Sequence, residues 1–351
     1  MTAKIGVSSL WGRRGKMRFG VGMFTGQRAP GTRRTHSELY ADLLRYARLI
    51  EDVGLDSVWV VEQHFAEDGH MASVLPVCAA LSAVTNRLTI GTSVVRASFY
   101  HPIRLAEDAI TIDLLSRGRF VLGIGPAYRE EEFHGMGIEF ESDVERLDDT
   151  IEILRRAFSG RPFSYSGRYY HVPELTVTPA PYTPGGPRLM LASNGVIERH
   201  AVDAAESGSM FMIDPSLSWD AIVRIVELYD QHLAPGVSPE LPVFSYGFIA
   251  ESGEPWAKMR EGFSYIRKVY DSWMGRPPAD RIAPEDFRLV LGNVDSVTQQ
   301  ILTYRRQFGD RLHFIMRLCY PGQDPSDVEA AIRLYGEVAT AIRATAPAVV
   351  S

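Results

Sequence analysis

The chain has 351 residues, of which 45% are hydrophobic and 23% charged, and its formal net charge is −6. This balance leaves no basic surplus for nucleic acid or a membrane surface, and no apolar run approaches the roughly 18 residues of a membrane span. Basic residues near the N-terminus follow rather than precede an apolar stretch, unlike a signal peptide. Cys78 and Cys319 are too few for a disulfide framework or a thiolate metal site. We therefore expect a cytoplasmic α/β protein without nucleic-acid or membrane partners.

Eight short runs along the chain are nearly continuously apolar, as expected of parallel strands that are buried on both faces. These runs are Met17–Phe24, Ser57–Val61, Leu88–Val95, Phe120–Ile124, Arg188–Ala192, Met210–Ile213, Val243–Ile249 and Leu312–Leu318. Helical spacing follows each run, and capping-box patterns at Thr35–Glu38, Ser142–Glu145 and Ser326–Glu329 predict helix starts. Eight such units in about 330 residues are typical of a (β/α)8 TIM barrel.

Three segments depart from this rhythm. Residues 1–16 predict an N-terminal extension ahead of a single barrel domain over residues 17–346. Residues 163–187 hold four tyrosines among five prolines and predict a loop or hairpin inserted in a βα loop. Residues 271–287, rich in Gly and Pro, follow the seventh strand, where either a mobile lid or an ordinary surface loop fits.

The main alternative fold is a doubly wound sheet with a G-x-G-x-x-G phosphate loop. Gly20-x-Gly22 and Gly123-x-Gly125 each follow a strand, but Thr25 and Tyr128 occupy the position of the last glycine. The incomplete loops favour the barrel.

Polar residues at strand ends are the candidate site residues, because these ends meet at the mouth of a barrel. Glu62-Gln63-His64 leaves the second strand, and a carboxylate beside an imidazole can orient it for proton transfer. A metal site is not predicted, because this pair supplies two ligands where three or more are needed. His64 also fits a purely structural role as a hydrogen-bonded residue of the mouth.

Two further segments suit a bound phosphate. Ser193-Asn194-Gly195 follows the fifth strand and opens a helix, where backbone N–H groups attract anions; ordinary N-capping explains the same residues. Gly125 lets a ligand approach the fourth strand, with Tyr128 and Arg129 nearby, although crowding in the mouth also requires a small residue.

The landmarks, in their order, resemble the luciferase-like, flavin-dependent monooxygenase superfamily. They are Met17-Arg-Phe-Gly-Val, Gly54-Leu-Asp-Ser-Val-Trp59, Glu62-Gln-His-Phe65, Leu88-Thr-Ile-Gly-Thr92, His101-Pro-x-Arg-x-Ala-Glu-Asp108, Asp113-x-x-Ser116-x-Gly-Arg-Phe120, Leu122-Gly-Ile-Gly125 and Tyr128-Arg-x-Glu-Glu-Phe133. The resemblance is strong to about residue 149 and weakens through Gly208. It implies a (β/α)8 barrel that binds FMN or the deazaflavin F420 at its mouth.

The resemblance also implies which residues touch the cofactor. Contacts to the flavin ring fall on Met23, Ser93 and Gly125, and a non-proline cis peptide is expected at Ser93–Val94. Contacts to the phosphate fall on a second set of residues, namely Tyr128, Arg129, Ser193, Asn194 and Gly195.

Glu62-Gln63-His64-Phe65 is similar to the E-H-H-F of the FMN-using branch, whereas F420-using relatives more often carry an aspartate first. This similarity implies a monooxygenase that uses reduced FMN and O2 on a small, mostly apolar organic substrate. Gln63 replaces the first histidine and cannot transfer a proton, so either His64 takes that role or the reaction needs no such base. The alternatives are an F420-dependent hydride-transfer reductase or dehydrogenase and a non-catalytic flavin-binding protein. The resemblance further implies a separate flavin reductase and a homo-oligomer, a dimer or tetramer.

Overall fold

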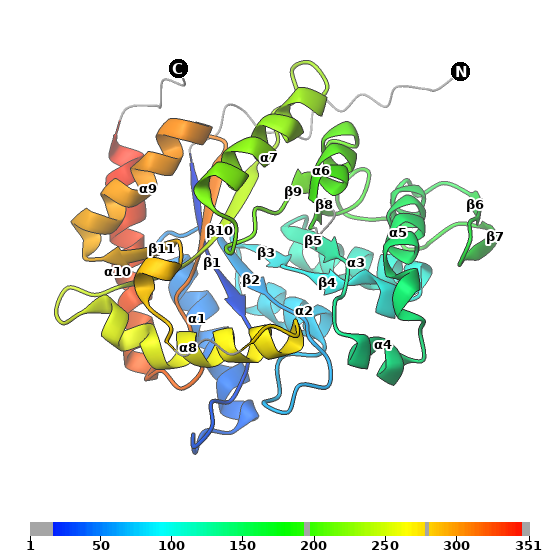
Figure 1. Ribbon diagram of the computed structural model, residues 1–351. Coiled ribbons are helices and arrows are strands. Elements are labelled where there is room, and N and C mark those ends of the chain that lie inside the picture. Colours follow the sequence, from blue (N-terminus) through cyan, green and yellow to red (C-terminus); the bar gives the residue numbers. More distant parts are fainter. Residues whose placement is uncertain (1–16, 193–196, 278–280, 346–351) are drawn as a thin grey trace.

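The structure is a computed structural model that describes residues 17–192, 197–277 and 281–345. The predicted extension, residues 1–16, lies outside the described residues. The centre is a parallel sheet (Figure 1). Its strands are β1 (Arg18–Phe24), β2 (Ser57–Val60), β3 (Thr89–Thr92), β4 (Val95–Arg96), β5 (Phe120–Gly125), β8 (Arg188–Leu191), β9 (Met210–Phe211), β10 (Leu241–Ile249), β11 (Leu289–Gly292) and β12 (Leu312–Arg317).

The sheet curls, so that the first and last strands of the chain are neighbours. Hydrogen-bonded strands follow the order β11-β10-β12-β1-β2-β3-β5-β8-β9, with β4 beside β5. Ile213, just beyond β9, makes a further parallel bridge to Val243 of β10. The structure confirms an α/β fold with a curled parallel sheet. It also contains β11, a four-residue strand beside the end of β10 that the sequence count missed.

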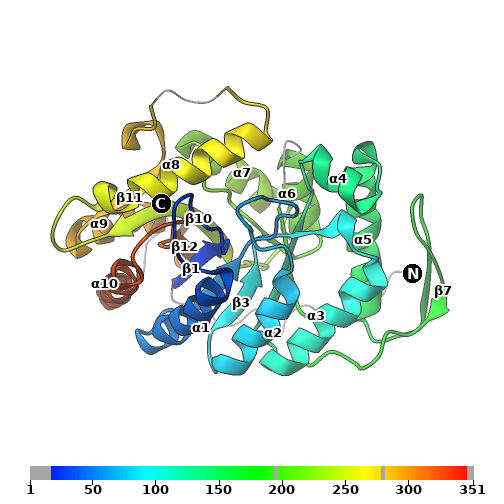
Figure 2. The ribbon, with the colours of Figure 1, turned by 90° about the horizontal axis from the view of Figure 1, so that it is seen from below.

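Helices surround the strands, as Figure 2 shows from below. They are α1 (His36–Asp52), α2 (Val74–Val84), α3 (Pro102–Ser116), α4 (Glu130–Met136), α5 (Asp143–Phe158), α6 (Ile197–Glu206), α7 (Trp219–His232), α8 (Pro255–Trp273), α9 (Val294–Phe308) and α10 (Pro325–Ala344), with 3-10 turns η2 (Ala97–Phe99), η3 (Phe140–Ser142) and η4 (Pro284–Asp286). Their apolar faces pack on the sheet.

One predicted capping box forms and two do not. Thr35 caps α1 with the complete box. The box at Ser142 is wrong, because the Ser142 hydroxyl donates instead to the Glu139 carbonyl, 2.6 Å away. The third box is also wrong, because α10 begins earlier, where the Asp324 side chain accepts the Ser326 N–H at 2.8 Å.

The Tyr/Pro-rich segment 163–187 contains an antiparallel hairpin. Its strands, β6 (Phe163–Ser166) and β7 (His171–Leu175), project at the side of the molecule (Figure 2). Tyr165 connects the hairpin to α5, since its hydroxyl donates to Asp149 Oδ1 at 2.5 Å. The first residues of segment 271–287 complete α8, and η4 lies near its end. The domain boundaries and the lid remain predictions.

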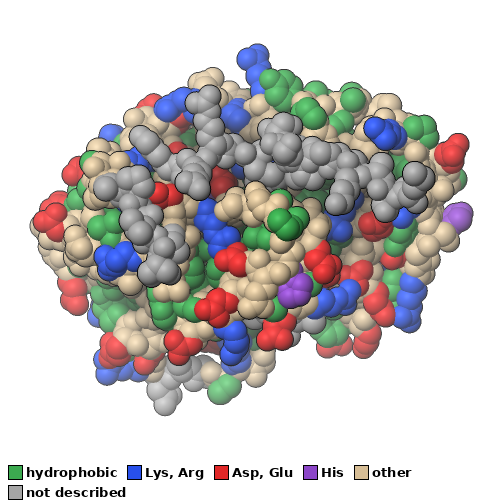
Figure 3. Space-filling view, turned by 90° about the horizontal axis from the view of Figure 1, so that it is seen from above, with side chains coloured by type: hydrophobic (Ala, Val, Ile, Leu, Met, Phe, Trp, Pro, Cys, Tyr) green, Lys and Arg blue, Asp and Glu red, His purple; other side chains and the backbone are tan. Residues whose placement is uncertain are grey.

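The surface has mixed charge. On the face seen in Figure 3, acidic and basic side chains of the described residues are interspersed and form no continuous area of one sign. Among the helices of residues 17–192, 197–277 and 281–345, none combines the length and the apolar content needed to cross a membrane.

Trp59 fills the interior of the curled sheet below the strand ends. It is 1% exposed, and a Cβ atom on Gly91 would lie 2.1 Å from its ring, so that only glycine fits there. The indole N–H donates to Ser57 Oγ at 2.8 Å, and Ser57 Oγ lies 2.7 Å from His313 Nε2. Phe244 packs edge-on against the Trp59 ring. These side chains fill the interior of the curled sheet, and in barrel folds ligand sites form at the C-terminal ends of the strands.

Glu240, which immediately precedes β10, gathers positive charge at the opposite ends of the strands. Its carboxylate pairs with Arg18 and lies 3.3 Å from Arg188 Nη1 and 3.6 Å from His313 Nδ1. Burial acts to raise the pKa of Glu240, but His313 and the two guanidiniums outweigh it and hold the pKa well below its ordinary value.

We expect Glu240→Gln to lower the free energy of unfolding by about 2 kcal/mol at pH 7, because two partly buried guanidiniums lose their counter-ion. A lowered pKa in the folded state stabilises the protein above the unfolded-state pKa of about 4.3, and this contribution is lost as the pH falls further. The difference from wild type therefore shrinks under acid. Urea denaturation at pH 7 and below pH 4 measures it, with exposed Glu337→Gln on α10 as the control. Equal stabilities at pH 7 would contradict this role.

Candidate active site

Glu62 organises the chain at the end of β2. Its side chain is fully buried, and its carboxylate accepts the backbone N–H of Arg96 at 2.6 Å and the hydroxyl of Tyr100 at 2.5 Å. Arg96 belongs to β4 and Tyr100 follows η2, so the carboxylate ties the end of β2 to the segment after β3. Both oxygens accept protein donors, which makes Glu62 an anchor of the site.

His64 lies beside this anchor. Its Nε2 is 3.4 Å from Glu62 Oε1 and makes no hydrogen bond to the described residues, although His64 is only 9% exposed. The backbone holds the ring in place, because His64 N–H donates to Glu132 Oε1 at 2.6 Å and the His64 carbonyl accepts from Arg129 Nη1 at 2.6 Å. Phe99 packs edge-on against the imidazole. The structure therefore places an imidazole next to a carboxylate, as the sequence predicted, with one ring nitrogen available.

Gln63 presents an amide donor to the mouth. Its Oε1 accepts from Arg96 Nη2 at 3.1 Å and from the Tyr128 hydroxyl at 3.3 Å. Its Nε2 is buried and lacks a partner within the described part of the chain. A buried amide N–H without an acceptor is costly, so this nitrogen is a natural donor to a bound molecule.

The Arg129 guanidinium contacts two carboxylates and an aromatic ring. It is 5% exposed, its Nη2 donates to Glu131 at 2.7 Å, and its Nη1 lies 3.5 Å from Glu132. The guanidinium also lies over the Trp273 ring, 4.3 Å from the centroid. These contacts hold the loop that carries His64. Contacts from Arg129 and Tyr128 to a phosphate remain predictions.

The residues predicted to touch a flavin ring lie at or just after the ends of strands β1, β3 and β5. Met23, at the end of β1, has a φ of 58°, an uncommon conformation for a non-glycine residue. The expected cis peptide at Ser93–Val94 is present, and Ser93 N–H donates to the Val60 carbonyl at 2.8 Å. A Cβ atom on Gly125 would lie 3.0 Å from Val94 Cγ2, so position 125 is tightly confined. This geometry fits a flat ring, whereas the contacts themselves remain predictions.

Ser193, Asn194 and Gly195 lie outside the described residues, between β8 and α6. Their predicted contacts to a phosphate therefore remain predictions.

Several residues around the mouth were not predicted as members of the site. His70 follows the Gln63 loop, Tyr246 and Arg317 come from β10 and β12, and Trp273 ends α8 and lies 6.2 Å from the His70 ring. Burial, followed by the charges of Arg317, Arg96 and Arg129, lowers the pKa of His70 to about 3, so this imidazole is neutral. Arg317 is a polar residue at the end of a predicted strand. The sequence criterion that selected the other site residues could therefore have found it as well.

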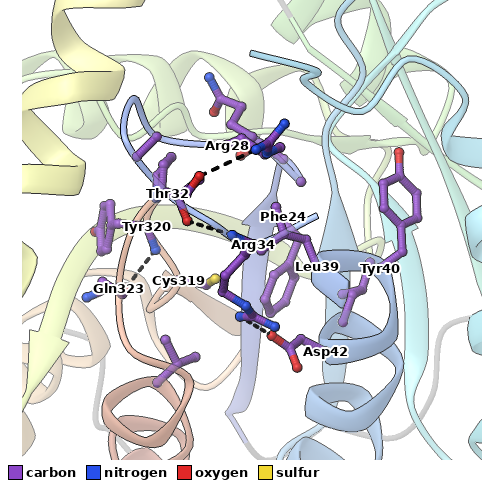
Figure 4. A pocket seen from close by; sticks show the side chains of 18 of the residues that line it. Phe24, Arg28, Thr32, Arg34, Leu39, Tyr40, Asp42, Cys319, Tyr320 and Gln323 are labelled. Carbon is purple, nitrogen blue, oxygen red and sulfur yellow. Dashed lines mark hydrogen bonds and ion pairs between the residues drawn. The ribbon is translucent and has the colours of Figure 1, made fainter. Parts of the chain in front are cut away.

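A cavity of about 70 Å³ lies between the loop after β1, helix α1 and the loop after β12 (Figure 4). Arg34 and Asp42 face each other in it as an ion pair of 2.5 Å. Thr25 and Cys319 line the same cavity. Its charged pair is balanced internally, and the cavity adjoins Arg317, which contacts Thr25 and Cys319.

Taken together, the curled sheet and the polar groups at its strand ends define an α/β protein with a candidate site at these strand ends. The chain belongs to the luciferase-like monooxygenase family, whose sequence profile matches residues 17–330.

Two curated proteins are similar to about half of this chain. The chain is 28% identical over 171 residues to the alkanal monooxygenase beta chain of Photorhabdus luminescens, covering 49% of this chain and 50% of that protein. It is 32% identical over 204 residues to an F420-dependent glucose-6-phosphate dehydrogenase of Amycolatopsis mediterranei (strain U-32), covering 56% and 58%. The chain thus spans about half the length of the curated relatives it matches.

A solved structure agrees in fold over nearly the whole chain. It is the oxygenating constituent of 3,6-diketocamphane monooxygenase from Pseudomonas putida, in complex with FMN. The TM-score is 0.75 with 18% identity, and the match covers 93% of this chain and 98% of that one.

We expect Glu62→Gln to lower the free energy of unfolding by about 2 to 3 kcal/mol, because an amide N–H would face one of two buried donors. Tyr100→Phe is the matched comparison, since it removes one donor and leaves the carboxylate intact, at a cost of about 1 kcal/mol. Chemical denaturation followed by circular dichroism measures both. If Glu62→Gln costs no more stability than Tyr100→Phe, the anchoring role is refuted.

Proposed function

We propose that the protein is a flavin-dependent monooxygenase that uses reduced FMN and O2 on a small organic substrate, with its curled sheet forming a (β/α)8 barrel. The observation that carries the proposal is the unsatisfied donor of Gln63 together with the tightly confined Gly125 position. A flat cofactor with carbonyl and ring-nitrogen acceptors suits this combination of a narrow surface and an amide donor. Family membership and the FMN complex of the structural neighbour support it.

Reduced FMN, when bound, supplies the two electrons with which one atom of O2 enters the substrate and the other leaves as water. The chain itself contributes positioning and exclusion of water. Met23, Ser93 and Gly125 would lie against the flat ring, and Gln63 would donate to its polar edge. The buried surroundings of these residues would exclude water from the reaction.

His64 is the group of this site suited to moving a proton. Its Nε2 lies 3.4 Å from Glu62 Oε1 and has no hydrogen-bond partner among the described residues, so the carboxylate can orient the ring for proton transfer. Gln63, at the position where E-H-H-F relatives carry a histidine, binds without titrating. Tyr128, Arg129, Ser193, Asn194 and Gly195 are proposed to hold the phosphate. A separate flavin reductase is proposed to deliver reduced FMN to a homo-oligomer.

The relationship to an F420-dependent dehydrogenase favours one alternative, hydride transfer with F420. Anaerobic titration with reduced FMN and reduced F420 separates the two functions. We expect FMN to bind at least about tenfold more tightly, a difference of about 1.4 kcal/mol, and oxygen uptake to begin when air is admitted. Tighter F420 binding with turnover in the absence of oxygen would establish the alternative. FMN binding without oxygen uptake above that of free reduced FMN would indicate a non-catalytic flavin-binding protein.

We expect His64→Ala to leave FMN affinity within about twofold and to lower substrate-dependent oxygen uptake by about 100-fold, the usual contribution of one acid–base group. His232→Ala is the control, because His232 is exposed at the end of α7. Unchanged uptake in His64→Ala would remove His64 from the mechanism.

A further inference from the structure

The last residue of β12, Arg317, lies inside the mouth. Side chains of a strand alternate between its two faces. Ile315 faces the interior, because a Cβ atom on Gly22 would lie 2.6 Å from Ile315 Cγ2, and His313 faces the interior toward Ser57. Arg317 is two residues beyond Ile315, so its side chain lies on the same interior face, nearer the C-terminal end of the strand. It is 1% exposed.

The charge of Arg317 has no counter-ion in the described part of the chain. Its hydrogen bonds run from Nε to the Cys319 carbonyl at 3.1 Å and from Nη2 to Thr25 Oγ1 at 3.3 Å, and both acceptors are neutral. No carboxylate of the described residues lies within ion-pair distance of it. A buried guanidinium requires either a paired anion or a full set of acceptors.

Arg317 nevertheless stays protonated. Burial acts to lower its pKa, but the phenol groups of Tyr270, Tyr320 and Tyr246 outweigh burial and raise it. These rings also supply an aromatic wall around the guanidinium, with the Tyr320 ring centroid 5.2 Å from Arg317 Cζ.

Arg288 shows how a structural arginine differs. It lies against Tyr304 of α9 and donates to five acceptors, namely Leu217 O, Tyr304 Oη, Asp214 O, Pro215 O and Phe244 O. Arg317, which is more deeply buried, has the Cys319 and Thr25 oxygens and the nearby Tyr270 hydroxyl. Part of the N–H capacity of Arg317 is therefore unused by the described residues.

The same part of the mouth holds two more unpartnered polar atoms. Thr25, which contacts Arg317, accepts the Met71 N–H at 2.6 Å through its carbonyl, and the Met71 carbonyl accepts the Gln63 N–H at 2.9 Å. Gln63 Nε2 and His70 Nε2 lack partners among the described residues, and these residues are 1% and 4% exposed. The backbones of Thr25, Met71 and Gln63 are thus joined by two hydrogen bonds, and the Thr25 hydroxyl contacts Arg317.

We propose that Arg317 is the counter-ion for an organic oxyanion, so that the substrate carries a carboxylate or an acidic phenol. A guanidinium binds such planar oxyanions through paired N–H donors, while the surrounding tyrosine rings accept an apolar body. The inference rests on the proposed function and narrows its substrate class from small organic molecules to small organic acids.

The inference can be tested without turnover by comparing how tightly the wild-type protein binds an organic acid and the uncharged amide of the same acid. Benzoate and hexanoate are titrated against benzamide and hexanamide by calorimetry, with and without oxidised FMN. We expect each acid to bind at least about tenfold more tightly than its amide. Equal affinities, or no binding of either acid, overturn the proposal.

Variants locate the effect. Arg317→Met should weaken benzoate by about tenfold or more and leave benzamide and FMN within about twofold, with Arg317→Lys intermediate. The matched control, Arg288→Met, should leave the preference for the acid unchanged. A loss of FMN and amide affinity equal to that of benzoate would assign Arg317 to the flavin and overturn the proposal. If Arg317→Met does not fold, the affinities of Arg317→Lys and of the wild-type protein for each acid and its amide still test the proposal.

These outcomes are independent of the monooxygenase reaction, because no reductant or oxygen uptake is involved. A protein that prefers acids but consumes no oxygen with reduced FMN would keep the oxyanion site and lose the proposed function. A protein that consumes oxygen but shows no preference for acids would do the reverse.

Discussion

The mouth of the curled sheet depends on one buried carboxylate. A carboxylate that is removed from water requires donors at its oxygens, and Glu62 obtains them from the Arg96 backbone and the Tyr100 side chain. These donors lie just beyond the Ser93–Val94 peptide, so a side chain at the end of β2 fixes the path of the chain after β3. The same contacts set the positions of Gln63 and His64, which follow Glu62 directly.

Positive charge around the mouth is distributed unevenly. Arg129 is neutralised by acidic residues and, through His64, holds the loop after β2. Arg34 is neutralised by Asp42 in the neighbouring cavity. Arg317 alone among these three arginines has no acidic partner in the described residues. The β12 side of the mouth therefore carries a positive charge without an acidic partner among the described residues, and this charge adds to burial, the larger cause, in lowering the pKa of His70.

Much of the fold could be predicted because each strand is a local apolar run and Thr35 is a local capping signal. The misses have physical reasons. Strand β11 is too short to stand out, and Ser142 and Asp324 compete for hydrogen bonds in ways that the motif alone does not resolve. In the site, Glu62 and His64 were foreseen because they lie close together in sequence. The protein partners of Arg129 and the burial of Arg317 depend on contacts between distant segments, which no local pattern encodes.

The pairing of β1 with β12 has a consequence for how the chain folds as it is made. The contact between Thr25 and Arg317 joins residues 292 positions apart. At typical rates of synthesis, β1 leaves the ribosome about 15 to 60 s before its partner exists. During that interval its apolar edge resembles an unpaired edge strand, which invites pairing with other chains. The nascent protein therefore has a long window in which a chaperone that covers β1 would favour correct folding.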